Sequence, residues 1–102
     1  MDMRTVADIK QDLASVLGVL QLSIIDLAVK KEVDSGRMTE SDLEDLHFVI
    51  GTAQVTSANL EMFIHQPPEF FTSDQVVLAI KLFREATGFA TQLQAEGYGK
   101  AN

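Results

Sequence analysis

The chain of 102 residues contains no cysteine. Disulfides, thiolate metal sites and a cysteine nucleophile are therefore excluded. Basic residues are also scarce, because 8 Lys and Arg stand against 15 Asp and Glu, for a formal net charge of −7 at pH 7. A negative surface disfavours nucleic acids and anionic membranes, both of which attract basic proteins. We expect no nucleic acid and no membrane among the partners, whereas a basic protein surface remains compatible.

Long hydrophobic runs are missing as well. The N-terminal sequence MDMRTVADIK has no apolar signal core. The longest apolar region is interrupted by Gln21, Ser23 and Asp26, and we expect it to be too short to span a bilayer. These features predict a cytoplasmic protein. The chain also lacks a glycine-rich phosphate loop and a nucleophile elbow, so we expect no enzyme and no cofactor.

Helical periodicity, by contrast, runs through most of the chain. Apolar residues recur every three or four positions and no strand pattern interrupts them, which predicts helices at about residues 5–35, 39–65 and 73–96. Each expected helix begins with a threonine followed three residues later by an acid or an amide, as in a capping box: Thr5 and Asp8, Thr39 and Asp42, Thr72 and Gln75. Gly36 and Gly97 are expected to end the first and third helices in the left-handed conformation, leaving a flexible tail at 97–102.

The expected fold is a single all-α domain, residues 1–102, built as a three-helix antiparallel bundle. Its apolar surface exceeds what three helices need. Residues 17–29, LGVLQLSIIDLAV, are apolar at nine of thirteen positions and point in every direction around a helix. A helix that is hydrophobic all round must be buried all round. We therefore expect a homodimer in which two helical hairpins complete a larger bundle; the alternative is a monomer with a central first helix.

The surplus apolar positions predict an interface with a second copy or with a protein partner. The candidate contact residues on the first two helices are Leu22, Ile25, Val29, Phe48, Val55 and Met62. Phe70, in the loop sequence PPEFF, is expected to plug the end of the bundle; the alternative is an exposed anchor for a partner. Phe71 is expected to pack against Val76 as a hydrophobic staple.

His47 is the residue that most suggests chemistry. The segment His47-Phe48-Val49-Ile50-Gly51-Thr52-Ala53 resembles the phosphoacceptor segment of histidine phosphotransfer domains, which implies an exposed phosphoacceptor histidine on a helical bundle. Where that family has a lysine, Ile50 stands here, and Glu44 and Asp45 would face a phosphohistidine without compensation. The small residues from Gly51 to Ala58 favour instead the close approach of another helix.

Metal ligation is a second chemical alternative. Glu44 and His47 have the Glu-x-x-His spacing of di-iron bundles, and Glu61 and His65 are four positions apart. These pairs lie about 25 Å apart along one helix, so they cannot share a site within one chain. Glu32 could approach Glu44 across the hairpin, and a dimer could then assemble a carboxylate-histidine cluster. The simpler interpretation is a polar helix face that meets water.

Acidic residues concentrate on the second helix, because five acids and no Lys or Arg occur between Met38 and Pro68. Acids favour the positive end of a helix, and the same face could meet a basic partner. Together these features favour a small acidic interaction module that binds and sequesters or inhibits a protein partner of unknown identity. An anti-activator, antitoxin, immunity protein or chaperone would all act in this way. A phosphotransfer carrier and a metal-binding bundle are the alternatives.

Overall fold

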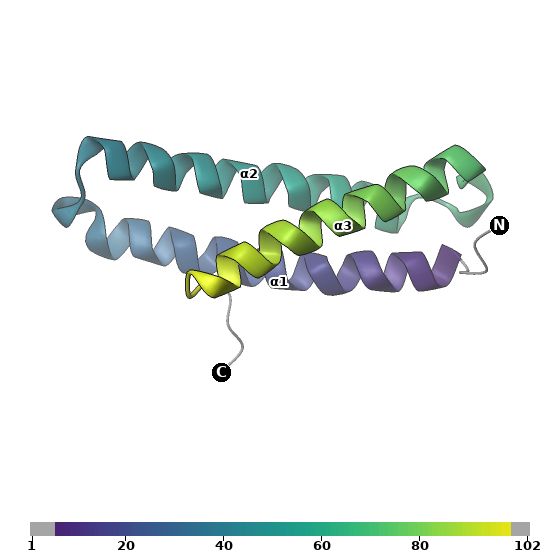
Figure 1. Cartoon of the computed structure of the whole chain (residues 1–102), viewed down its shortest axis with the longest axis horizontal. Coiled ribbons are helices and arrows are strands. Elements are labelled where there is room, and N and C mark those ends of the chain that lie inside the picture. Colours follow the sequence, from purple (N-terminus) through teal and green to yellow (C-terminus); the bar gives the residue numbers. More distant parts are fainter. Residues whose placement is uncertain (1–5, 99–102) are drawn as a thin grey trace.

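Three long helices make up the protein in a computed structural model, which describes residues 6–98 (Figure 1). They are α1 (Val6–Asp34), α2 (Glu40–His65) and α3 (Ser73–Ala95). Two single-turn 3₁₀ helices, η1 (Ser35–Arg37) and η2 (Pro68–Phe70), connect them. The predicted all-α, three-helix architecture is confirmed, and each described helix end lies within about one residue of its predicted position.

Threonine side chains start α2 and α3 as the sequence predicts. The Asp42 N–H donates to Thr39 Oγ1 at 3.1 Å, and the Thr39 N–H donates to Asp42 Oδ2 at 3.4 Å, which completes a capping box. At α3 the Gln75 N–H donates to Thr72 Oγ1 at 3.2 Å, so the threonine caps the helix. Its cap is one-sided, because the Thr72 N–H donates to the Phe70 carbonyl at 3.1 Å instead of to the Gln75 side chain. The expected Thr5 cap lies outside the described residues.

The two glycines expected to end helices behave differently. Gly97 has a φ of 96°, and the Gly97 and Tyr98 N–H groups donate to the Gln94 and Leu93 carbonyls at 3.0 and 2.9 Å. This pair of bonds is a Schellman motif. Gly36 does not adopt the left-handed conformation, because α1 tightens into η1 instead and the Met38 N–H donates to the Ser35 carbonyl. Tyr98 also packs against the core, so the predicted flexible tail does not begin at Gly97.

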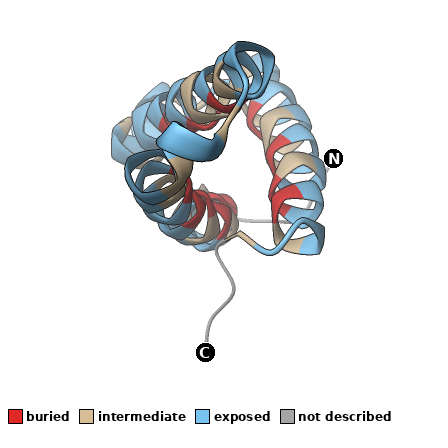
Figure 2. Cartoon of the chain, turned by 90° about the vertical axis from the view of Figure 1, so that its left-hand side faces the viewer, coloured by how far each residue is buried: buried red, intermediate tan, exposed pale blue. Residues whose placement is uncertain are grey.

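The core is formed by buried residues, and Figure 2 shows that these positions lie along the inner sides of the three helices. Its largest fully buried apolar members are Leu13, Leu20, Leu27, Leu60 and Leu93. Alanines fill the narrowest places, since Ala53, Ala79 and Ala86 have no exposed surface. Helix α1 contacts both other helices, and α3 crosses the α1–α2 hairpin obliquely and packs more closely on α1 than on α2 (Figure 1).

Helix α1 also corrects the expectation about bilayer length. The segment Val6–Arg37 contains an 18-residue window with a mean hydropathy of 1.8, which is long and apolar enough to cross a membrane by length and composition alone. Gln21, Ser23 and Asp26 interrupt its apolar sequence without shortening the helix. In this fold the inner side of the same helix supplies six buried residues, but only 28% of that hydrophobic window is buried, so core packing accounts for only part of its hydropathy.

Two buried serines lie on the facing sides of α1 and α2. The Ser23 hydroxyl is fully buried and donates to the Val19 carbonyl at 3.0 Å. Ser57 is 8% exposed, and its Oγ has no hydrogen-bond partner among the described residues. A buried hydroxyl without a partner keeps the cost of desolvation, which is about 1–3 kcal/mol.

We expect Ser57→Ala to raise the free energy of unfolding by about 1 kcal/mol, because it removes this unsatisfied group and improves helix propensity. Chemical denaturation monitored by circular dichroism measures the change. Ser23→Ala is the matched control; it gains the same propensity but loses a hydrogen bond, so its free energy of unfolding should rise less. A Ser57→Ala variant less stable than the wild type would show that the hydroxyl is satisfied.

Candidate protein-binding surfaces

The outer side of α1 carries a row of exposed apolar residues, which we call the α1 outer face: Leu22, Ile25, Val29 and Val33. At about 100° per residue, they lie opposite the buried positions of the same helix. Ile25 is 58% and Val29 56% exposed. No charged residue occurs between Asp12 and Asp26. The structure thus places the first three sequence candidates on one side of α1 and adds Val33, which continues the same spacing.

A second row lies on α2, which we call the α2 outer face: Phe48, Val55 and Met62. Their spacing of seven residues puts them on one side of the helix, opposite Leu46 and Ala53 of the core. Phe48 is 75% exposed and borders a shallow hollow of about 410 Å³ with Gly51, Thr52 and Val55. All three α2 candidates are therefore open to solvent.

The two outer faces point away from each other. Helices α1 and α2 pack together through their buried sides, and each row lies on the far side of its own helix. One flat partner surface cannot cover both rows at once. The sequence identifies the surplus apolar residues but does not show that they form two separate surfaces.

Phe70 does not plug the bundle, so this expectation is wrong. Its side chain is 61% exposed, although its carbonyl accepts a hydrogen bond from Gln66 Nε2 at 3.0 Å. Phe71 closes this end instead: its ring lies 6.1 Å from the Phe63 ring and packs against the core. The 3₁₀ turn at Pro68–Phe70 directs only one of the two phenylalanines inward. Phe70 is exposed, as the alternative prediction of an anchor for a partner requires.

The histidines and acids of α2 do not form a metal centre within residues 6–98, where no group of three or more His, Cys, Asp or Glu side chains is placed to hold an ion. Glu44, His47 and His65 are exposed. Glu61 Oε1 accepts a long hydrogen bond of 3.5 Å from Gln21 Nε2, so it faces α1. The exposed position of His47 is the one that a phosphoacceptor requires, and Ile50 contributes to the core beneath it.

The close helix contact predicted at Gly51 is not made by α1 or α3. A Cβ atom added there would meet nothing within 4 Å among residues 6–98, so neither α1 nor α3 approaches that position. The intrachain contact uses Ala53 and Ser57 on the other side of α2. The small residues around Gly51 therefore belong to the open α2 outer face.

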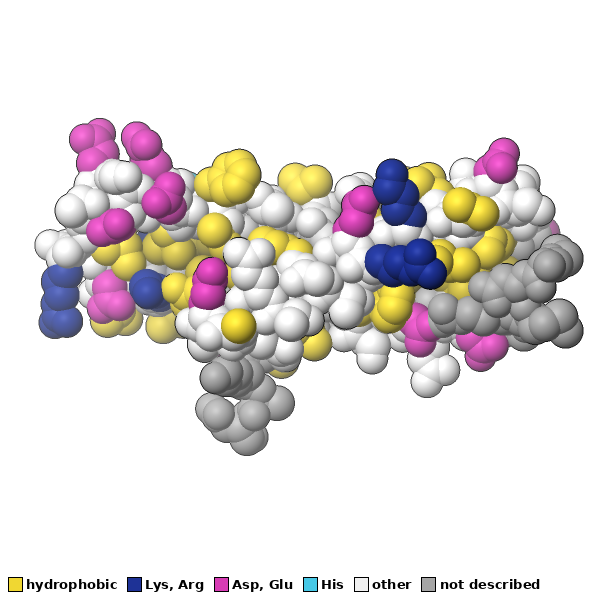
Figure 3. Space-filling model, viewed as in Figure 1, with side chains coloured by type: hydrophobic (Ala, Val, Ile, Leu, Met, Phe, Trp, Pro, Cys, Tyr) yellow, Lys and Arg dark blue, Asp and Glu magenta, His cyan; other side chains and the backbone are white. Residues whose placement is uncertain are grey.

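The sequence did not predict a further hollow. A cleft of about 660 Å³ lies between α1 and α2 at the η1 end of the hairpin, beyond the end of α3. Figure 3 shows hydrophobic side chains in this hollow and acidic side chains along its α2 edge. Its apolar lining consists of Leu27, Met38, Leu46 and Val49, together with the Tyr98 ring, and its charged residues are Lys30, Asp34, Arg37, Asp42, Asp45 and Glu96. We call it the hairpin cleft.

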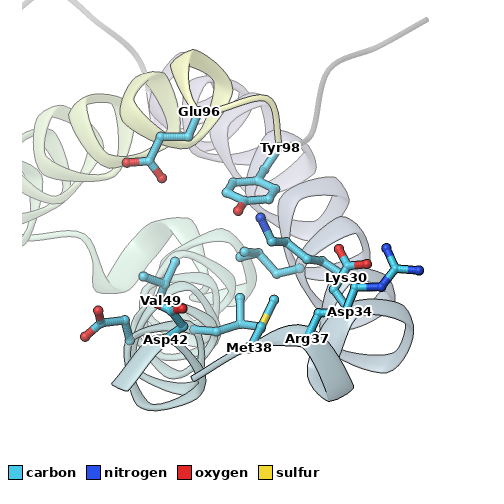
Figure 4. A pocket seen from close by; sticks show the side chains of 11 residues that line it. Lys30, Asp34, Arg37, Met38, Asp42, Val49, Glu96 and Tyr98 are labelled. Atoms are coloured by element: carbon cyan, nitrogen blue, oxygen red, sulfur yellow. The ribbon is translucent and has the colours of Figure 1, made fainter. Parts of the chain in front are cut away.

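Tyr98 and Lys30 meet at the edge of this cleft. The Lys30 Nζ lies 5.4 Å from the centre of the Tyr98 ring, and Figure 4 shows the two side chains side by side. A hydrogen bond to the Tyr98 side chain raises the pKa of Lys30, and the nearby carboxylates of Asp34 and Asp42 raise it further. The end of α3 is thereby attached to α1 where the bundle opens.

No protein-family model, curated protein or solved structure matches the chain. Function is therefore inferred from the surfaces themselves.

We expect Tyr98→Phe to lower the pKa of Lys30 toward its ordinary value, because the variant keeps the ring but loses the hydroxyl. A raised pKa in the folded state stabilises the protein at pH values below the unfolded pKa, and that contribution is lost as the pH rises through the folded pKa. The variant should therefore keep its helical structure but should lose the part of the folding stability that depends on the raised Lys30 pKa. NMR titration of the Lys30 side chain measures it, and an unchanged Lys30 pKa would contradict the hydrogen bond.

Proposed function

We propose that the protein is a non-catalytic helical module that binds another protein through the α1 outer face. The observation that carries this proposal is the row of Leu22, Ile25, Val29 and Val33, each about half exposed or more, on a surface with few charges. Contiguous exposed apolar surface of this kind marks interaction sites. A partner held there would be sequestered or blocked, as by an anti-activator, antitoxin, immunity protein or chaperone acting in the cytoplasm.

The energetics suit a helix that docks in a groove. Fully burying one such side chain gains about 1.5–3 kcal/mol, and these are already part-buried, so each retains about half of that gain for a partner. Four of them offset part of the cost of association, which is about 4–15 kcal/mol. Spacing of three and four residues along one helix is the pattern of anchors that an apolar groove receives.

A second copy of the chain is one occupant of this face. Because no charged residue occurs between Asp12 and Asp26, and the next turns carry charges of both signs (Asp26, Lys30, Lys31 and Glu32), two copies can approach there despite a net charge of −7 on each. A homodimer and a complex with another protein would then compete for the same residues. Self-association would keep the apolar face covered until the partner binds.

We expect wild-type protein at high micromolar concentration to elute as a dimer in size exclusion with light scattering. The double variant Ile25→Lys/Val29→Lys should elute as a monomer, because lysines at the centre of the interface would have to be desolvated. The matched control Phe48→Lys/Val55→Lys makes the same chemical change on the α2 outer face and should leave the dimer intact. Pairing through α1 is contradicted if the wild type is a monomer. It is also contradicted if only the Phe48→Lys/Val55→Lys control loses the dimer.

The partner itself is tested by affinity capture from the native cells with mass spectrometry. We expect wild type and the Phe48→Lys/Val55→Lys control to recover the same protein in comparable amounts. Ile25→Lys/Val29→Lys should lose it, with unchanged helical content by circular dichroism. Equal recovery by all three baits, or loss only in the α2 control, would contradict docking on the α1 outer face.

A further inference from the structure

We propose that the hairpin cleft binds a basic amphipathic helix of another protein. The cleft lies between α1 and α2 at the η1 end, whereas the α1 outer face points away from α2. The two surfaces are separate, so this inference goes beyond the proposed function and can fail independently of it.

The shape of the cleft follows from unequal helix lengths. Helix α1 has 29 residues and α3 has 23, so at 1.5 Å per residue α3 is about 9 Å shorter. Its oblique path across the hairpin leaves more of the η1 end uncovered (Figure 1). The open seam between α1 and α2 has room for about two turns of an added helix, which would lie beyond the end of α3.

The floor of the cleft is apolar, as a helix contact requires. Leu27 and Leu46 are buried at its base, and Met38 and Val49 are half-buried around them. These side chains pack within the core that α3 covers elsewhere along the hairpin. An incoming helix would place its apolar side on Met38 and Val49, which retain exposed surface on the floor, and beside the half-buried Tyr98 ring at the edge.

The charges around the rim of the cleft favour a positively charged helix. Four carboxylates, from Asp34, Asp42, Asp45 and Glu96, line the cleft with two cations, Lys30 and Arg37. Lys30 is already bonded to Tyr98 and lies close to Asp34 and Asp42. Arg37 extends toward the outer edge in Figure 4. The rim of the cleft therefore carries an excess of negative charge.

Helix α2 reinforces this sign, because no Lys or Arg occurs between Met38 and Pro68. A helix with lysine or arginine beside its apolar stripe complements such a wall, and opposite charges across an interface favour the right partner over wrong ones. A second copy of the chain fits less well, because each copy carries a net charge of −7 and would bring further acids to an already acidic rim.

Tyr98 provides a built-in reporter. The chain has one tyrosine and no tryptophan, so its tyrosine emission comes from the edge of the cleft. The probe is a synthetic leucine–lysine amphipathic peptide of about 14 residues, or about four helical turns, without aromatic residues. A peptide with glutamate in place of every lysine is its control.

We expect the lysine peptide to change Tyr98 emission saturably and the glutamate peptide to leave it unchanged. The variant Asp42→Lys/Asp45→Lys should bind the lysine peptide at least about tenfold more weakly. Glu69→Lys/Asp74→Lys carries the same change in net charge at the opposite end of the bundle and should bind within about twofold of wild type. Ile25→Lys/Val29→Lys should also bind as wild type does. Circular dichroism establishes that each variant retains its helices.

Several results would overturn the inference. They are an unsaturable or absent response, equal weakening in the Glu69/Asp74 control, or equal binding of the glutamate peptide. Loss of peptide binding in Ile25→Lys/Val29→Lys would move the contact to the α1 outer face. A change in Tyr98 emission with protein concentration alone would assign the cleft to a second copy.

Discussion

Helix α1 has apolar residues on all sides but only two neighbouring helices to bury them, and this constraint shapes the rest of the molecule. Leu13, Leu20 and Leu27 face inward and are fully buried. Alanines at 53, 79 and 86 let α2 and α3 come close to that side. The opposite side then has no neighbour among the described residues, which leaves Ile25 and Val29 exposed. The α1 outer face is thus a consequence of how the core forms.

A second consequence comes from the length of α3. Because it is shorter than the hairpin and crosses it obliquely, one end of the α1–α2 seam remains uncovered. The Schellman turn at Gly97 then positions Tyr98 beside Lys30, which fixes the end of α3 at the edge of the opening. The protein therefore offers chemically different surfaces: an exposed apolar row on α1 and an acid-rimmed cleft at the end of the hairpin.

Local features of the fold could be predicted from the sequence because they depend on neighbouring residues. Thr39 and Thr72 cap their helices through bonds to backbone three residues away, and helical periodicity identifies the residues of each stripe. The prediction that a left-handed Gly36 ends α1 was wrong, because a 3₁₀ turn ends the helix equally well. The prediction that Phe70 plugs the bundle was wrong. Phe70 and Phe71 compete for one inward position, and only the path of the loop decides between them.

The candidate surfaces were predictable only in part. Periodicity indicated that Leu22 and Phe48 lie off the core stripes, but it did not indicate that their rows point in opposite directions. The cleft could not be predicted because its residues come from α1, the α1–α2 connection, α2 and the segment that follows α3, and they meet only once the crossing of α3 is known. Relative helix placement is a tertiary property, and no short sequence window contains it.

Site-specific photo-crosslinking in the native cells tests most directly whether α1 is the docking helix. A photoreactive amino acid would replace Ile25 in one variant and the equally exposed Val55 on α2 in another. We expect a discrete crosslinked product from position 25, containing a partner protein or a second copy, and none from position 55. A product from position 55 with none from position 25 would contradict the central claim.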